Sequence, residues 1–213
     1  MDIKKQTLTD SLQRYIHNLE EGFGDIPAAR KEHLQLLSNY LTAKYEQESD
    51  TPELIVICTH NSRRSHMGAI WLGAAADYYE LPTLKTYSGG TEATAFNPRA
   101  VAAMRRAGFD IQVYAASSAN PNYHVSWTPD GPNHLAFSKK YDAEANPASD
   151  FAAIMVCNSA DEACPFVPGA DFRLALPFDD PKAFDDTPQE EEKYDERCAQ
   201  IGREMLWVLK QVK

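Results

Sequence analysis

The chain has 213 residues, of which 43% are hydrophobic, so it is long enough to bury one sizeable core. Its 21 basic and 31 acidic residues give a net charge of −10, which argues against nucleic acid or an anionic membrane as a partner. The N-terminal residues MDIKKQTLTD lack the apolar segment of a secretion signal, and no apolar run is long enough to cross a bilayer, so we expect a cytoplasmic protein.

The cysteines and histidines form neither a disulfide scaffold nor a metal site. Four cysteines are too few for a disulfide framework and lack the spacing of a zinc ribbon, which favours catalytic or redox use of the thiols. The six histidines follow no ligand pattern. We therefore expect no metal and no cofactor.

Two amphipathic helices are predicted between about residues 8 and 47, with a break near GFGDIP. We interpret residues 1–50 as an N-terminal helical extension that packs on the rest of the protein or forms a dimer contact. Residues 51–213 are predicted to form an α/β domain.

The segment CTHNSRRS is the most informative part of the chain. It follows a buried strand at residues 54–57 and precedes an Ala-rich helix at residues 65–79, so its N-H groups can converge on one concavity that suits a tetrahedral oxyanion. Arg64 can bind two oxygens of that anion bidentately, and its charge and the helix N-terminus favour the thiolate of Cys58. Asn61 suits a left-handed backbone position or can brace the loop through its amide, and Ser65 can donate its hydroxyl to the thiolate. The predicted oxyanion-binding residues are Thr59, His60, Asn61, Ser62, Arg63, Arg64 and Ser65.

The spacing Cys-x5-Arg is weak by itself, because any of four cysteines can meet an arginine at that distance by chance. The alternative is a buried cysteine in a strand-to-helix turn. The preceding strand, the loop residues and the following helix together favour the functional interpretation.

The rest of the chain continues the alternation of strands and helices. We predict a strand at residues 84–87, a Gly-rich turn at SGG, and a helix at residues 98–107 with Asn97 as N-cap and Pro98 in the first turn. Strands at residues 151–157 and 172–176 and a helix at residues 189–212 follow. The predicted fold class is α/β, a three-layer sandwich with a small parallel sheet of about four strands.

Residues 114–150 fit this scheme least well and are interpreted as an inserted segment. They are rich in Asn, Pro, Ser and aromatic residues, and they can form a β-hairpin that turns at Asp130-Gly131. Their aromatic side chains either cover apolar surface or form a lid over the substrate.

Two further cysteines and one aspartate fall near the same sheet edge if the strands are parallel, because ligands bind at the carboxyl ends of such strands. Cys157 ends a strand, and Cys164 follows after six small or polar residues, which suits a segment that rearranges to close a disulfide. The alternative is that both are buried small hydrophobic residues. Asp180, directly before Pro181, is the best general-acid candidate, with Asp179 as its competitor.

With these motifs assembled, the chain resembles the low-molecular-weight protein tyrosine phosphatase superfamily and, within it, the thioredoxin-coupled arsenate reductases. The likeness spans residues 53–212 and is carried by CTHNSRRS, by YSGG with NPRAVAAMRRAGFDI, and by VCNSADEACP with PFDDP. It implies that Cys58 is the nucleophile, that Arg64 binds the oxyanion and that Asp180 is the acid. Cys157 and Cys164 would complete a disulfide relay.

Three functions follow from these residues. The leading hypothesis is arsenate reduction, with a small oxyanion as substrate and thioredoxin or a similar dithiol as partner. The alternative is a low-molecular-weight phosphatase that hydrolyses phosphotyrosine or small phosphomonoesters through a cysteinyl-phosphate. Lys182-Ala183 after Asp180-Pro181, in place of the aromatic pair common in tyrosine phosphatases, argues against phosphotyrosine as the substrate. A third possibility is an oxyanion-binding or redox-sensing protein without catalysis.

Overall fold

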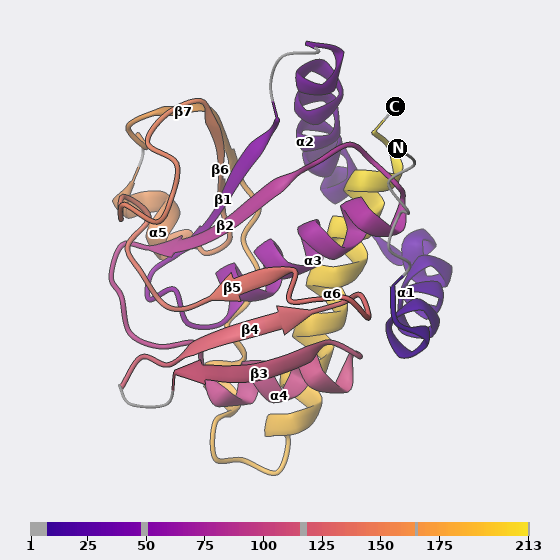
Figure 1. Cartoon of the computed structure of the whole chain (residues 1–213), viewed down its shortest axis with the longest axis vertical. Coiled ribbons are helices and arrows are strands. Elements are labelled where there is room, and N and C mark those ends of the chain that lie inside the picture. The colour runs from indigo at the N-terminus through magenta and orange to yellow at the C-terminus, as the bar shows by residue number, and fades with distance from the viewer. Residues whose placement is uncertain (1–7, 48–50, 116–118, 165, 213) are drawn as a thin grey trace.

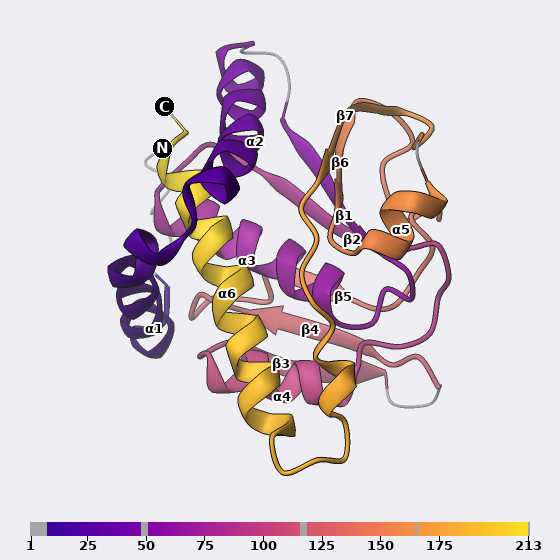
Figure 2. The same cartoon turned by 180° about the vertical axis from the view of Figure 1, so that it is seen from behind.

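A computed structural model describes residues 8–47, 51–115, 119–164 and 166–212. Four parallel strands form the main sheet in the order β2-β1-β6-β7. Their bounds are β1 (Glu53–Cys58), β2 (Lys85–Gly90), β6 (Phe151–Met155) and β7 (Ala170–Ala175). Helix α3 (Arg64–Tyr78) packs against β1 and β2, and the C-terminal α6 (Glu190–Lys210) runs beside α3 (Figures 1 and 2). The predicted α/β fold class with a small parallel sheet is confirmed.

The remaining helices pack around these two. They are α1 (Asp10–Glu21), α2 (Ala28–Glu46), α4 (Pro98–Arg106) and the short α5 (Asn158–Ala163), with 3-10 turns η1 (Gly22–Asp25) and η2 (Pro181–Phe184). The predicted cap of α4 is confirmed, because the Asn97 side chain accepts a hydrogen bond from the N-H of Arg99 and Pro98 occupies the first turn. Within the described residues, no helix is long and apolar enough to cross a membrane.

The second sheet is antiparallel and contains three strands, β3 (Asp110–Ala115), β4 (Asn122–Ser126) and β5 (His134–Ala136). The predicted hairpin is confirmed as β4-β5, and Asp130-Gly131 lies in its connection. Strand β3, which pairs with β4 along one edge, was not predicted. This strand carries an acidic residue at its start and exposed side chains at Val113 and Tyr114, so it lacks the apolar run of a core strand.

The prediction of a turn at SGG was wrong, because these residues form the end of β2 and pair with β1 as far as Cys58 and Gly90. Both glycines are required by close backbone contacts. A Cβ atom on Gly89 would lie 2.5 Å from the Cα of Tyr141, and one on Gly90 would lie 2.3 Å from the carbonyl oxygen of Glu92. Glycine here marks a close approach of two chain segments rather than a turn.

The N-terminal helices share the core of the protein through contacts with α6. The apolar faces of α1 and α2 are fully buried at Leu12, Ile16 and Leu34. Across the same interface, the Arg30 guanidinium pairs with Glu204 at 2.7 Å, and the Ser38 hydroxyl donates to the carbonyl of Val208 at 2.9 Å. Figure 2 shows α1 and α2 flanking the C-terminal helix.

The first prediction tests this packing. Leu34→Ala removes a fully buried side chain, and we expect it to lower the free energy of unfolding by about 2–5 kcal/mol. Leu36→Ala is the matched control on the same helix, since Leu36 is 47% exposed. Urea unfolding of both variants provides the measurement. Equal effects of the two substitutions would contradict the packing of α2 described here.

Candidate active site

The loop between β1 and α3 is held in shape by hydrogen bonds to its carbonyl groups. The carbonyl of Thr59 accepts from the N-H of Glu92 at 2.8 Å, and the carbonyl of His60 accepts from the hydroxyls of Thr94 and Ser138 at 3.0 and 3.1 Å. The N-H groups of residues 59–63 find no acceptor within the described part of the chain. These donors are therefore available to an oxyanion.

Asn61 fixes the loop in both ways that the sequence suggests. Its backbone is left-handed, with φ of 43°. Its side-chain amide donates to the Ser65 hydroxyl at 2.9 Å, and its oxygen accepts from the N-H of Lys139 at 2.8 Å. The Ser65 hydroxyl, which accepts from Asn61, lies 3.1 Å from the sulfur of Cys58, so its own proton is free to be donated to that sulfur. Cys58 and Ser65 are both buried.

His66, a residue of α3 that was not predicted to belong to the site, supports the loop. The His66 ring is fully buried and stacks on Phe96 with ring centroids 4.2 Å apart. Burial, and then the nearby Lys139, hold the pKa of His66 well below its ordinary value, so the ring is neutral. Its Nε2-H donates to the carbonyl of Asn61 at 3.0 Å, which leaves Nδ1 to accept from Ser88 at 3.1 Å. Its position directly after Ser65 was the feature of the sequence that could have indicated a role in the site.

Both arginines of the loop lie within ion-pair distance of Asp180, Arg64 at 2.6 Å and Arg63 at 3.9 Å, but their hydrogen bonds differ. Arg64 donates to Asp180 at 2.6 Å and to the carbonyl of Phe178 at 2.7 Å, and its buried Nε has no partner in the described residues. Arg63 instead donates to the hydroxyl of Tyr194 at 2.7 Å and to Asp185 at 3.2 Å. The structure thus brings Asp180 into direct hydrogen bonding with Arg64, whereas the hydrogen bonds of the Arg63 side chain go to α6 and the loop before it.

Asp180 and its competitor Asp179 differ in exposure and contacts. The Asp180 side chain is 33% exposed, and its carboxylate also accepts from the N-H of Lys182 at 3.0 Å, which caps η2. The Asp179 side chain is 96% exposed and, among the described residues, pairs with Arg197 at 3.5 Å. Only Asp180 therefore contacts the loop.

Cys157 lies beside the loop, whereas Cys164 is more distant. The buried Cys157 follows the end of β6, and its sulfur lies 3.5 Å from the hydroxyl of Thr59 and accepts from the N-H of Ala160 at 3.4 Å. Cys164 is partly exposed at the opposite end of α5, where its carbonyl accepts from Arg173. All four cysteines are free thiols.

Comparison with known proteins identifies the class of the fold. The chain superposes on a mutant of YwlE from Bacillus subtilis with a TM-score of 0.52 and 16% identity, over 76% of this chain and 98% of that chain. A low-molecular-weight protein tyrosine phosphatase from T. tengcongensis gives a TM-score of 0.50 and 14% identity, over 75% and 99% of the two chains. The fold is therefore that of the low-molecular-weight phosphatases. No protein-family model matches the chain.

Curated relatives give the family. An arsenate reductase of Staphylococcus epidermidis is 31% identical over 133 residues, which cover 62% of this chain and 80% of that protein. The arsenate reductase of Bacillus subtilis is 31% identical over 138 residues, which cover 65% and 78%. The chain belongs to the arsenate reductase family, and it is an enzyme of the arsenate reductase or low-molecular-weight phosphatase type.

The second prediction concerns Asn61. Asn61→Ala removes two buried hydrogen bonds and leaves an alanine in a left-handed backbone conformation, which its Cβ atom disfavours. We therefore expect the free energy of unfolding to fall by about 2–4 kcal/mol. Asn61→Gly removes the same hydrogen bonds but adopts positive φ freely. Denaturant unfolding should show the glycine variant to be about 1 kcal/mol more stable than the alanine variant. The opposite order would contradict the strained backbone.

Proposed function

We propose that this protein is an arsenate reductase in which Cys58 is the nucleophile, Arg64 and the loop amides bind the oxyanion, and Asp180 is the acid. Cys157 and Cys164 form the disulfide relay. The observation that carries the proposal is the position of Cys157, whose sulfur lies 3.5 Å from Thr59, the residue next to Cys58. Hydrolysis of a phosphate ester needs no second thiol at this place.

In the first step, the Cys58 thiolate attacks the arsenic atom of arsenate. The loop N-H groups of residues 59–63 and the unpartnered Nε of Arg64 stabilise the negative charge on the oxygens. An As–O bond breaks, and the oxygen leaves as water after it receives a proton from Asp180. For this step the substrate has to replace the Asp180 carboxylate on the guanidinium of Arg64, where the carboxylate now lies at 2.6 Å.

In the second step, the Cys157 thiolate attacks the sulfur of Cys58. A disulfide forms between them, and the electron pair of the S–As bond passes to arsenic, which leaves as arsenite in the trivalent state. The Cys164 thiolate then attacks the sulfur of Cys157, which releases Cys58 as a thiolate. Two thiols have been oxidised to one disulfide, and one arsenate has been reduced by two electrons.

The last disulfide requires α5 to unwind. Seven residue steps along a helix span about 10 Å, whereas the Cα atoms of a disulfide lie about 4.4–6.8 Å apart. The helix between the two cysteines has only six residues, so its unwinding costs little free energy. Arg173 restrains it by donating to the carbonyls of Asp161 and Cys164, so these hydrogen bonds must break when the disulfide closes.

A dithiol partner such as thioredoxin would restore the enzyme by attacking the Cys157 to Cys164 disulfide. Cys164 is partly exposed, and Phe166, two residues further on, is 74% exposed. A partly exposed cysteine two residues before an exposed aromatic residue suits the docking of a thiol protein. The four free thiols suit a reducing compartment, and we therefore propose that the protein works in the cytoplasm.

The second candidate function is phosphatase activity. Cys58, Arg64 and Asp180 suffice for transfer of a phosphoryl group to Cys58 and its hydrolysis, and the chain has the low-molecular-weight phosphatase fold. This function would not involve Cys157 or Cys164. Arsenate reduction through the relay therefore requires both thiols, whereas phosphatase activity requires neither.

The third prediction separates them through alanine variants of all four cysteines. We expect Cys58→Ala, Cys157→Ala and Cys164→Ala each to abolish multiple-turnover oxidation of thioredoxin by arsenate, because each removes one step of the relay. Cys198→Ala is the matched control, since Cys198 is buried against Met104 far from the loop along the chain. Full turnover by both Cys157→Ala and Cys164→Ala would refute the relay. Cys157→Ala should still hydrolyse p-nitrophenyl phosphate if the loop is intact.

The fourth prediction concerns the acid. Asp180→Asn keeps the size of the side chain but cannot donate the proton of a carboxylic acid, so we expect kcat to fall by about 10²–10⁴-fold. Asp179→Asn, at a side chain that is 96% exposed, should stay within about twofold of the parent enzyme. Steady-state kinetics with arsenate measure both variants. A larger loss of kcat in Asp179→Asn than in Asp180→Asn would show that Asp180 is not the acid.

A further inference from the structure

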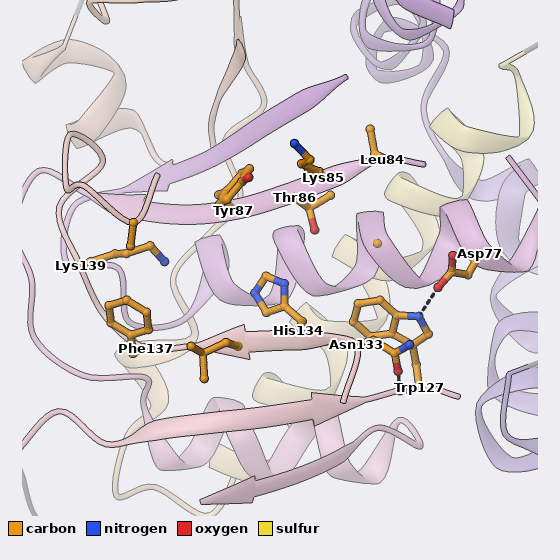
Figure 3. A pocket seen from close by; sticks show the side chains of 13 residues that line it. Asp77, Leu84, Lys85, Thr86, Tyr87, Trp127, Asn133, His134, Phe137 and Lys139 are labelled. Atoms are coloured by element: carbon orange, nitrogen blue, oxygen red, sulfur yellow. Dashed lines mark hydrogen bonds between the residues drawn. The ribbon is translucent and has the colours of Figure 1, made fainter. Parts of the chain in front are cut away.

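A second cavity lies away from the cysteine loop, between the two sheets and beside α3 (Figure 3). Its volume is about 430 Å³. Its walls come from β2, from α3 and from the segment that includes β5. None of the residues predicted for the cysteine loop or the disulfide relay lines it, so it is distinct from the site described above.

Lys139 is the charged group at one end of this cavity. The side chain is 93% buried, given its 7% exposure, and Figure 3 shows it directed into the cavity. Its ammonium lies 4.5 Å from the centre of the Phe137 ring. Within the described residues, no carboxylate forms an ion pair with it. Burial lowers the pKa of Lys139 to about 8, so at neutral pH the group is still mainly a cation.

His134 contributes a second unsatisfied group to the same cavity. Its Nε2 is buried and has no hydrogen-bond partner in the described part of the chain. Burial, and then the charge of Lys139, lower the pKa of His134 to about 4, so the ring is neutral at pH 7 and one of its nitrogens carries a proton to donate. An unpaired buried cation and an unpaired buried ring nitrogen both cost free energy that an acceptor in the cavity would recover.

The other walls suit an apolar body with a single negative charge. Trp127, Phe137 and Tyr87 provide aromatic surface. At the opposite end, Asp77 accepts from the Trp127 indole N-H at 2.6 Å, and at the rim Lys85 is already paired with Glu53 at 2.8 Å. The Asp77 carboxylate would repel a second negative charge placed at that end.

We propose that this cavity is a second ligand site that binds a small organic monoanion, a carboxylate on an aromatic or apolar body. The carboxylate would contact Lys139 and His134, and the body would lie between Trp127, Phe137 and Tyr87. One hydrogen bond links a residue of this cavity to the cysteine loop, since the backbone N-H of Lys139 donates to the side-chain oxygen of Asn61 at 2.8 Å.

The test is calorimetric titration of the full-length protein at pH 7 with benzoate as the probe. We expect saturable binding at one site, and at least about tenfold weaker binding of benzamide, which has the same shape without the charge. Lys139→Met keeps the apolar stem of the lysine and should weaken benzoate at least about tenfold. Lys85→Met, at a lysine on the rim that is 52% exposed, is the matched control and should change it less than about twofold.

Two further variants keep the test decisive. His134→Phe fills part of the cavity and removes the ring nitrogen, so it should also weaken benzoate, whereas Arg64→Met should leave benzoate binding intact. Thermal melting should show Lys139→Met to be no less stable than the parent, because it removes an unpaired buried cation. Absence of saturable binding, equal affinity for benzamide, or loss of binding in Arg64→Met but not in Lys139→Met would each overturn the proposal.

Discussion

The candidate site depends on the parallel pairing of β1 with both of its neighbours. Ile57 is in register with Gly89 of β2 and with Met155 of β6, so all three strands end at the same edge of the sheet. This register carries Cys58 and Cys157, which are 99 residues apart, into one region, and the parallel β7 delivers Asp180 to it. The apolar residues 54–57 are almost completely buried, which fixes the register because a slip would expose them or bury polar groups.

The shape of the loop between β1 and α3 is fixed by hydrogen bonds from several parts of the chain. Its backbone carbonyls accept hydrogen bonds from residues of the 91–97 segment and from Ser138, and His66 and the Asn61 side chain hold it from within. Preorganised donors need little reorganisation when charge develops, which is the physical basis of oxyanion stabilisation. The hydrogen bond between Arg64 and Asp180 joins this loop to the segment that follows β7.

Much of the fold and the site follows from local sequence patterns. The buried strand before Cys58, the capped helix at Asn97 and the left-handed preference of Asn61 are properties of neighbouring residues, and the structure confirms them. The strand β3 and the role of His66 were not predicted, because each depends on a partner far away in the chain, Val125 for Ile111 and Ser88 for His66. The glycines at the end of β2 were interpreted as a turn. Gly89 is instead required by the close approach of Tyr141, a contact that the local sequence does not reveal. The partners of Arg63 were likewise hidden, as Tyr194 and Asp185 lie more than a hundred residues away.

In the proposed mechanism, Cys157 and Cys164 supply the two electrons that reduce arsenate, by forming a disulfide. Mass spectrometry of the full-length protein after turnover with arsenate, quenched by acid and alkylated, tests it most directly. We expect a disulfide between Cys157 and Cys164 with Cys58 and Cys198 still reduced, and a disulfide between Cys58 and Cys157 in the Cys164→Ser variant. Arsenate turnover that leaves all four cysteines reduced, or that joins a different pair, would contradict the account.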